Sequence, residues 1–267
     1  MNNLIQRLIT GFILIILVLA GIFYLPAKWF ALVAGLVVFA AALEYFLMWQ
    51  KDKIFLFISL LSLLFFYLLL EFTLPIIGLV CGVVWWLIAP YFLVYYSKNG
   101  ENILTNVFIR WLVGILVFIP CLIGMVELKS IFGAGYLLYV LIAVWAADVG
   151  AYFSGKFFGK HKLAEFVSPN KTTEGVIGGI VLSTIVSLVG GFILKLQGIE
   201  LLLIITLIIV TCLWSVIGDL FESMLKRDAN IKDSGCLLPG HGGIYDRIDS
   251  LTAAIPIFTL GLMFFLK

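Results

Sequence analysis

The feature that most constrains this chain is a series of long apolar segments separated by short polar ones. A helix needs roughly 20 apolar residues to cross the hydrocarbon core of a bilayer. Nine segments approach that length, at residues 8–25, 29–49, 54–70, 73–96, 108–126, 131–153, 175–197, 201–221 and 251–266. The last has 16 residues, so it either tilts little or begins inside the preceding polar loop. The sequence therefore predicts an all-α polytopic membrane protein of about nine transmembrane helices.

Composition supports a single membrane bundle. The chain is 63% hydrophobic and 12% charged, whereas a soluble domain is typically about 25% charged. Its four cysteines lack paired spacing, so we expect neither a disulfide framework nor a zinc site. The first apolar segment lacks a small-x-small cleavage site and is expected to be retained.

The basic residues are divided unevenly between the two sides of the predicted bundle. With nine spans, 13 lysines and arginines fall with the N-terminus and the loops after the second, fourth, sixth and eighth spans, against 4 on the other side. Loops rich in lysine and arginine face the cytoplasm. We therefore expect an integral protein of the bacterial inner (plasma) membrane whose N-terminus and polar site are cytoplasmic.

Charge gathers in two windows on that same side, residues 148–174 and 219–249, which hold 17 of the 32 charged residues. Because both windows face one compartment, they can meet. We therefore interpret residues 131–267 as a catalytic region with cytoplasmic loops 154–174 and 222–250. Residues 1–130 would be a scaffold or a route for lipid.

Two predicted helix ends each carry a carboxylate on a polar stripe. The spacing i, i+3, i+4, i+7 places four residues on one face of the eighth span: Asp219, Glu222, Ser223 and Lys226. Asp148 and Tyr152 form a similar stripe at the end of the sixth span. Mg²⁺ takes oxygen ligands, often one or two carboxylates plus substrate phosphates. The alternative is helix-end solvation or a salt bridge between helices.

Residues 238–249 form the most distinctive motif. Gly240, Gly242 and Gly243 would let backbone N–H groups approach an anion and would accept positive φ. His241 would either donate to a phosphate or occupy a structural turn.

Three charged residues close this motif, just before the ninth span. Asp246 and Asp249 are candidate metal or substrate ligands, and Arg247 can pair bidentately with a phosphate. A competing interpretation is that Asp249 caps the ninth helix together with Ser250.

The segment 168–175 opens the seventh span. Helix N-termini bind anions, and Lys171 with the hydroxyls of Ser168 and Thr172 would suit a phosphate; Asn170 lies between them. A helix cap at Thr172 or Thr173 is an alternative that is compatible with phosphate binding. The chain lacks the P-loop run, HExxH and the Rossmann glycine fingerprint, which argues against a P-loop ATPase.

Together these motifs resemble the phosphatidate cytidylyltransferases (CDP-diacylglycerol synthases). The resemblance covers roughly residues 145–251. It includes Asp148-Val-Gly-Ala-Tyr-Phe-Ser-Gly155, Gly159-Lys-His-Lys162, Ser168-Pro-x-Lys-Thr172, Gly218-Asp219 and the run from Ser223-x-x-Lys-Arg227 to Asp249. Thr173 departs from the family, in which many members have tryptophan.

The resemblance implies transfer of CMP from CTP to phosphatidic acid, giving CDP-diacylglycerol and pyrophosphate with Mg²⁺, as one or two ions. It implies that Asp219 and Asp246 hold the metal, and Asp148 is our third candidate ligand. The remaining negative charge would be shared by Lys171, Lys226, Arg227, Lys232 and Arg247. Ser223 and Tyr152 would contact substrate.

Two other function classes remain open. A polyprenol or phytol kinase would share the CTP and metal contacts and differ in its acceptor. An ion-coupled transporter would place its charges near the middle of the bilayer, whereas here they lie at helix ends. We expect no nucleic-acid partner. A homodimer is compatible with the glycine pairs at 178–179 and 190–191, which allow close helix packing.

Overall fold

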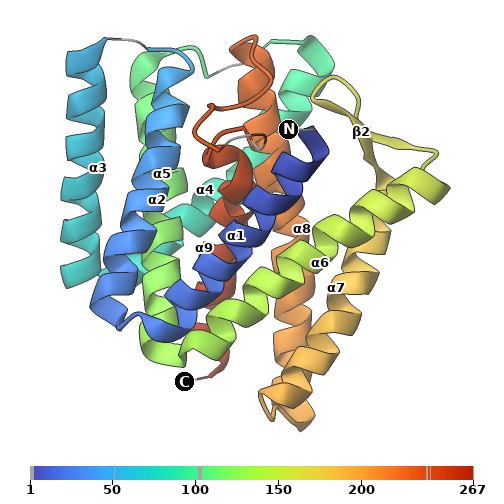
Figure 1. Ribbon diagram of the computed structural model, residues 1–267. Helices are drawn as coiled ribbons and strands as arrows, with labels where there is room; N and C mark the ends of the chain where they lie inside the picture. Colours follow the sequence, from blue (N-terminus) through green and yellow to red (C-terminus); the bar gives the residue numbers. More distant parts are fainter. Residues whose placement is uncertain (1–2, 51, 102–103, 239, 241, 267) are drawn as a thin grey trace.

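The computed structural model describes residues 3–50, 52–101, 104–238, 240 and 242–266, with side chains from residue 9 onward. In these ranges the chain forms nine α-helices and one small sheet (Figure 1). The elements are α1 (Asn3–Tyr24), α2 (Ala27–Leu47), α3 (Lys53–Thr73), α4 (Pro75–Asn99), α5 (Val107–Glu127), the π-helical turn η1 (Leu128–Phe132), α6 (Ala134–Phe158), β1 (Lys162–Ala164), β2 (Ser168–Thr172), α7 (Thr173–Ile193), α8 (Gly198–Asp228) and α9 (Tyr245–Phe265).

Each predicted span corresponds to one of these helices. Within the described chain, eight helices, α2 to α9, are long and apolar enough to cross a membrane, and α1 contributes a shorter apolar stretch, Ile9–Tyr24. At 1.5 Å per residue, a helix of 21 residues is about 30 Å long, which matches the hydrocarbon core. The prediction of an all-α polytopic membrane protein is confirmed.

Successive helices alternate in direction, which brings both charged windows to one end of the bundle. The C-terminal ends of α6 and α8, the N-terminal ends of α7 and α9, and the β1–β2 hairpin all lie at the upper end in Figure 1. We call this the polar end.

Local sequence signals explain where helices begin at the polar end. Asp52 accepts hydrogen bonds from the backbone N–H groups of Ile54 (2.8 Å) and Phe55 (2.9 Å), so it caps α3. Asn106 caps α5 by accepting from the N–H of Phe108 (2.8 Å). Short polar side chains at these positions satisfy N–H groups that have no partner inside the helix.

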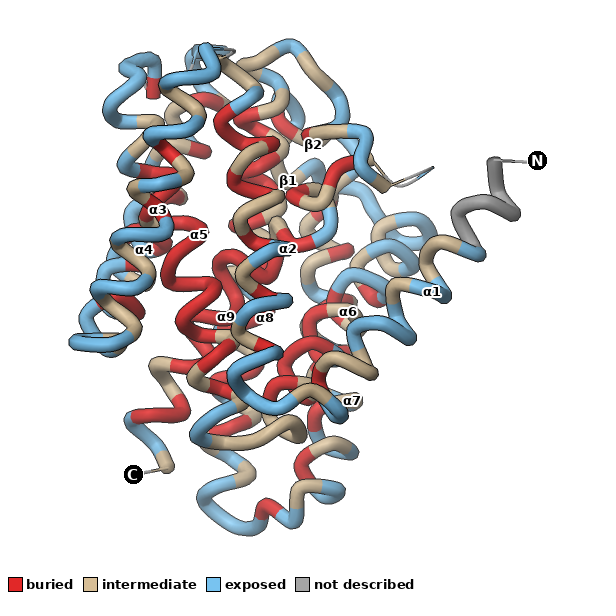
Figure 2. Tube along the Cα trace, turned by 60° about the vertical axis from the view of Figure 1, so that its left-hand side comes forward, coloured by how far each residue is buried: buried red, intermediate tan, exposed pale blue. Residues whose placement is uncertain are grey.

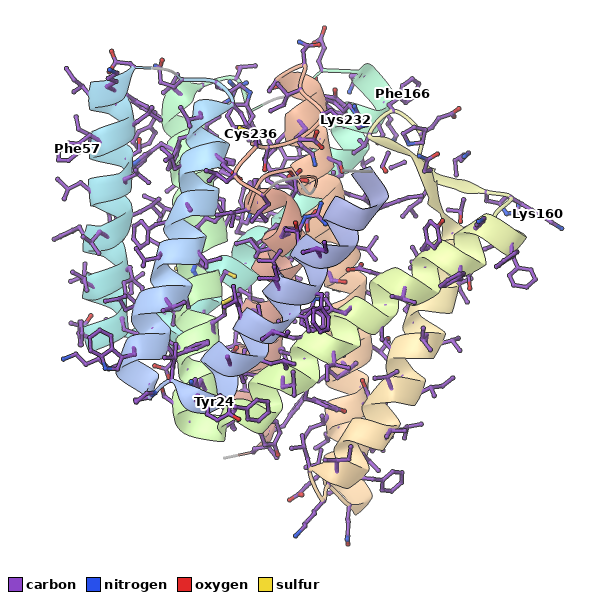
Figure 3. The ribbon with its side chains drawn as sticks, viewed as in Figure 1. Tyr24, Phe57, Lys160, Phe166, Lys232 and Cys236 are labelled. Carbon is purple, nitrogen blue, oxygen red and sulfur yellow. The ribbon has the colours of Figure 1, made fainter. Side chains whose placement is uncertain are left out.

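Helix α9 lies at the centre of the bundle, and α3 lies at its edge. Most of α9 and α5 is buried, whereas α3 is largely exposed (Figure 2). Phe57 of α3 is 66% exposed and points away from the bundle (Figure 3). Such an apolar outer face is expected where lipid is the solvent. Trp86 of α4 donates its indole N–H to the carbonyl of Thr252 in α9 (2.9 Å), so N-terminal helices support the C-terminal one.

Helices α6 and α7 pack along a seam of small residues. A Cβ on Gly150 would lie 2.6 Å from the carbonyl oxygen of Gly178, and one on Gly179 would lie 2.6 Å from the carbonyl oxygen of Ala147. The second glycine pair, 190–191, packs against side chains of α6 and α8. Both glycine pairs therefore serve close packing within the chain.

The structure corrects the predicted loop boundaries. Helix α8 continues to Asp228 and α9 begins at Tyr245, so the loop predicted at 222–250 is limited to 229–244. The window 154–174 contains the end of α6 and the antiparallel β1–β2 hairpin. Hydropathy locates only the part of a helix that crosses the membrane. The polar residues at the end of α8 and the start of α9 are also helical, so the loop between them is shorter than the polar segment.

Candidate active site

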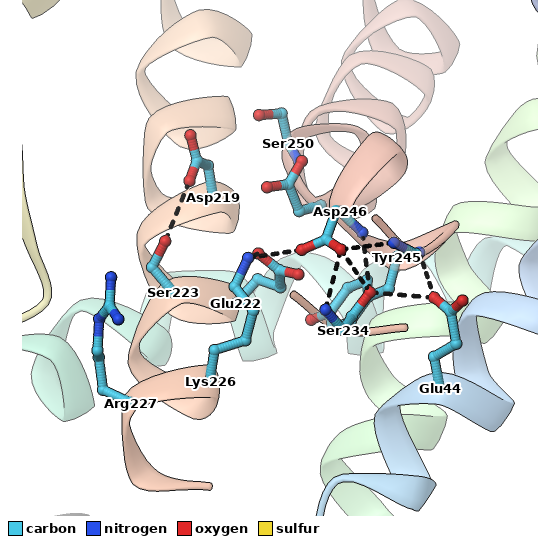
Figure 4. Close-up of polar contacts among 12 residues, drawn as sticks. Glu44, Asp219, Glu222, Ser223, Lys226, Arg227, Ser234, Tyr245, Asp246 and Ser250 are labelled. Atoms are coloured by element: carbon cyan, nitrogen blue, oxygen red, sulfur yellow. Dashed lines mark hydrogen bonds and ion pairs between the residues drawn. The ribbon is translucent and has the colours of Figure 1, made fainter. Parts of the chain in front are cut away.

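The candidate site lies at the polar end, where α8 and α9 meet (Figure 4). Lys226 of α8 links two carboxylates: its Nζ lies 2.6 Å from Oε2 of Glu222 and 2.6 Å from Oδ1 of Asp246. The Glu222 side chain is fully buried and that of Asp246 is 6% exposed. The interpretation as a salt bridge between helices is thus correct for Lys226, which pairs with Asp246 of α9, whereas its pair with Glu222 lies within α8.

Asp246 is held in one orientation by the loop that precedes α9. Its Oδ2 accepts hydrogen bonds from the N–H groups of Gly243 (2.8 Å) and Ser234 (2.9 Å), and it lies 3.0 Å from the Ser234 hydroxyl (Figure 4). The Gly243 amide therefore approaches an anion as expected, but that anion is the Asp246 carboxylate.

Asp219 pairs with the β1–β2 hairpin. Its Oδ2 lies 2.5 Å from Nζ of Lys171 in β2, and its Oδ1 accepts a long hydrogen bond from Ser223 (3.4 Å). The charge of Asp219 also acts on Asp148 of α6 and on Asp249 of α9. The predicted ligands Asp148 and Asp219 therefore belong to one electrostatic group, although they come from different helices.

Hydrogen bonds to residues at the start of α7 hold the segment that precedes this helix. Thr172 caps α7 by accepting a hydrogen bond from the N–H of Gly175 (3.1 Å), which confirms the cap interpretation. Glu174 accepts from the N–H groups of Lys160 (3.1 Å) and His161 (3.2 Å) and so holds the start of the hairpin. The two other predicted residues in β2 lie close to Lys171; Ser168 is half-buried and Asn170 is exposed.

The glycine loop has the predicted positive φ at two of its three glycines, and Gly243 does not adopt it. Gly240 and Gly242 have φ of 75° and 82°, in the left-handed region that favours glycine. The N–H of Leu238 donates to the carbonyl of Gly242 (3.0 Å), which closes the loop. His241 lies outside the described residues.

The remaining basic candidates line the outside of the site. Arg227 is exposed, and its Nε donates to the carbonyl of Val167 (3.3 Å), which attaches the hairpin to α8. Lys232 in the 229–244 loop and Arg247 in the first turns of α9 are exposed (Figure 3 labels Lys232). Tyr152 is 62% exposed on α6.

The interpretation of Asp249 as a helix cap is wrong. Because α9 begins at Tyr245, Asp249 lies inside the helix, one turn past its start, and its carboxylate accepts from the N–H of Ser250 (2.8 Å). Its charge interacts with those of Glu222 and Asp219, both on the α8 stripe.

One buried acid of this end was missed. Glu44 of α2 is 4% exposed, and its Oε2 accepts from the N–H of Tyr245 (2.9 Å) and lies 3.0 Å from the Ser234 hydroxyl. The signal was available, because Glu44 is the one charged residue in the segment 29–49. An ionisable residue inside a membrane span usually has a function.

The charge of the site fits a divalent cation. Five carboxyl groups are gathered here with two lysines that pair with them; the acids are Asp148, Asp219, Glu222, Asp246 and Asp249, and the lysines are Lys171 and Lys226. Within the described residues, no three acidic, histidine or cysteine side chains converge as a ready metal-binding group. Mg²⁺ commonly takes only one or two carboxylates and completes its shell with phosphates and water, so the donor set is suitable.

Comparison with known proteins places this arrangement in a family. The model of the cytidylyltransferase family matches residues 5–265. A phosphatidate cytidylyltransferase of Pseudomonas aeruginosa is 39% identical over 95% of this chain and 94% of its own length. One of Haemophilus influenzae is 36% identical over 98% of this chain and 99% of its own. These matches extend the motif resemblance over the N-terminal half, and the chain belongs to the cytidylyltransferase family, as a relative of the phosphatidate cytidylyltransferases.

Proposed function

We propose that this chain transfers CMP from CTP to phosphatidic acid, giving CDP-diacylglycerol and pyrophosphate in phospholipid biosynthesis. The full-length relatives carry the name of this nucleotidyltransferase activity. The structural observation that carries the proposal is the convergence of Asp219, Asp246 and their lysine partners at one end of the bundle.

The chemistry explains why the site is rich in charge and needs no activated histidine or cysteine. A phosphate oxygen of phosphatidic acid attacks the α-phosphorus of CTP, the bond between the α- and β-phosphates breaks, and pyrophosphate leaves. The attacking oxygen is already largely ionised near neutral pH, so no strong base is required. The reaction instead requires in-line positioning and neutralisation of two anions.

The basic residues would supply much of that neutralisation. Lys171 and Lys226 each end in a mobile ammonium that can exchange a carboxylate partner for a phosphate. Arg227, Lys232 and Arg247 lie on the exposed rim, where they would meet the outer phosphates of CTP. The left-handed glycines Gly240 and Gly242 would let the loop backbone approach the nucleotide.

We assign Mg²⁺, as one or two ions, to the carboxylates of Asp219 and Asp246, with Asp148 as a third candidate. When bound, the cation would neutralise phosphate charge, including the charge that develops on pyrophosphate. Asp246 is suited to this role because three contacts to its Oδ2 fix the carboxylate while Oδ1 faces Lys226.

The site position also suits a lipid substrate. The acyl chains would stay in the bilayer beside α6, α7 and α8, which carry exposed apolar residues, while the head group enters the polar end. We further propose that the polar end is cytoplasmic and that the protein resides in the bacterial inner membrane, since 13 of 17 basic residues lie on that side of the predicted bundle. CTP is a cytosolic nucleotide, which agrees with this orientation.

The first test is pyrophosphate release by purified protein in detergent–phosphatidic acid micelles with CTP and Mg²⁺. Release should require both substrates and should be abolished by EDTA and by Asp246→Asn. Asp52→Asn is the matched control, since Asp52 is an exposed cap of α3 and asparagine caps equally well. Activity that survives Asp246→Asn would refute the metal assignment. Nucleotide turnover with a polyprenol but not with phosphatidic acid would show that the protein is a polyprenol kinase and would refute the cytidylyltransferase proposal.

A further inference from the structure

A carboxylate from the N-terminal half of the chain is built into the candidate site. Glu44 of α2 is 190 positions from Ser234 in sequence, yet the two side chains lie 3.0 Å apart and both are buried. The same Glu44 oxygen accepts the N–H of Tyr245, the first residue of α9. A buried carboxylate is costly unless hydrogen-bonded, so these two contacts hold α2 to the loop and to the start of α9.

Ser234 connects Glu44 to the candidate metal ligand. Its hydroxyl lies 3.0 Å from Oε2 of Glu44 and 3.0 Å from Oδ2 of Asp246, and its backbone N–H donates to the same Asp246 oxygen (Figure 4). Movement of Ser234 would therefore change the orientation of Asp246. Among the described residues, Glu44 contacts neither Lys226 nor Asp219. Any effect of Glu44 on these two side chains must therefore be transmitted through the 229–244 loop and the start of α9.

Two glycines of the motif leave room for Glu44. A Cβ on Gly235 would lie 2.7 Å from Cδ of Glu44, and one on Gly243 would overlap both the Ser234 hydroxyl, its nearest atom, and Oε2 of Glu44. Neither glycine has φ in the left-handed region, so the backbone conformation does not require glycine there. Close approach of the Glu44 carboxylate requires glycine at position 235, and the Glu44 carboxylate together with the Ser234 hydroxyl requires it at position 243.

We propose that Glu44 is a positioning residue for the transfer reaction: it holds Ser234 and the first residue of α9 so that Asp246 keeps its orientation. The predicted effect of Glu44 on turnover rests on the proposed function. What Glu44 contributes is acceptance of hydrogen bonds, so an amide oxygen can replace the carboxylate while an aliphatic side chain cannot.

The kinetic test compares Glu44→Gln with Glu44→Leu. Glu44→Gln should keep kcat within about threefold of the unaltered protein, because its amide oxygen still accepts both hydrogen bonds. Glu44→Leu should lower kcat by about tenfold or more with little change in KM for CTP and phosphatidic acid, since substrate-binding groups are untouched. Glu71→Leu, at the opposite end of the bundle, is the matched control.

A second readout does not depend on turnover. Cys236 is exposed and follows Gly235 directly, so a spin label on it reports the mobility of the loop. The label would be placed in a Cys81→Ala background, which removes the other exposed cysteine; Cys121 and Cys212 are buried. Label mobility should rise in Glu44→Leu and should stay unchanged in Glu44→Gln and Glu71→Leu.

The outcomes separate the two proposals. Equal kcat in Glu44→Leu and Glu44→Gln, or unchanged label mobility in Glu44→Leu, would overturn the role of Glu44. Absence of CTP turnover in the unaltered protein would refute the proposed function. The mobility of the spin label on Cys236 would still test whether Glu44 positions the loop. If Glu44→Leu does not fold, a double-mutant cycle of Gly235→Ala and Glu44→Ala replaces it. Because the new Cβ overlaps the carboxyl, the double variant should lose less stability than the sum of the two single losses, and strictly additive losses would overturn the inference.

Discussion

Lys226 of α8 lies 2.6 Å from the Asp246 carboxylate of α9, and this ion pair joins the helices that carry Asp219 and Asp246, two of the proposed metal ligands. The same ammonium also pairs with Glu222, one helical turn away on α8. A single cation thus balances two acids that are almost completely removed from solvent.

Lys226→Met should destabilise the protein strongly. The substitution leaves Glu222 and Asp246 without their cation, and removing one partner of a buried ion pair costs about 3–5 kcal/mol. The measurement is thermal unfolding in detergent, with Lys53→Met as a control because Lys53 is exposed at the start of α3. An unchanged melting temperature would show that the two acids do not depend on Lys226.

Lys171→Met should affect activity far more than stability. The Lys171 and Asp219 side chains are 25% and 30% exposed, and an ion pair this open to water contributes about 0–1 kcal/mol. Because Lys171 is assigned to phosphate, KM for CTP should rise by about tenfold, the equivalent of 1.4 kcal/mol in binding. Steady-state kinetics and thermal unfolding of the same preparations check both expectations. Lys98→Met, at the exposed end of α4, should change neither.

Mg²⁺ with CTP should raise the melting temperature, and EDTA should remove the effect. A ligand at 100 times its Kd stabilises the folded state by about 2.7 kcal/mol. Asp219→Asn should lose the Mg²⁺-dependent part of this stabilisation, whereas Asp52→Asn should retain it. Full retention in Asp219→Asn would remove Asp219 from the metal site, whatever its effect on turnover.

Gly150→Ala should loosen the α6–α7 pair. Its new Cβ would lie 2.6 Å from the carbonyl oxygen of Gly178, a backbone atom that cannot move without shifting the helix. Overpacking of this kind costs about 1–3 kcal/mol. Gly21→Ala in α1 is the control, since its Cβ would meet only the Leu25 side chain, at 3.9 Å. Equal melting temperatures for the two variants would contradict close contact between α6 and α7.

Much of the fold and part of the site followed from local sequence patterns. The apolar segments predicted all nine helices, because hydropathy over about 20 residues is a property of neighbouring positions. The i, i+3, i+4, i+7 stripe from Asp219 to Lys226 was equally local, and all four of its members make contacts with one another along α8 or with α9. The start of α9 was placed too late, because its first turns are polar and carry no hydropathy signal.

The sequence by itself determined the membrane-spanning helices, the acidic and basic motifs between them and, through those motifs, the family. Only the tertiary structure decided which of these groups meet. It paired Lys171 with Asp219, joined Lys226 to Asp246, and brought Glu44 of α2 to Ser234 across 190 positions. Such contacts depend on how whole helices pack side by side, and no periodicity along the chain records which helix will lie next to which.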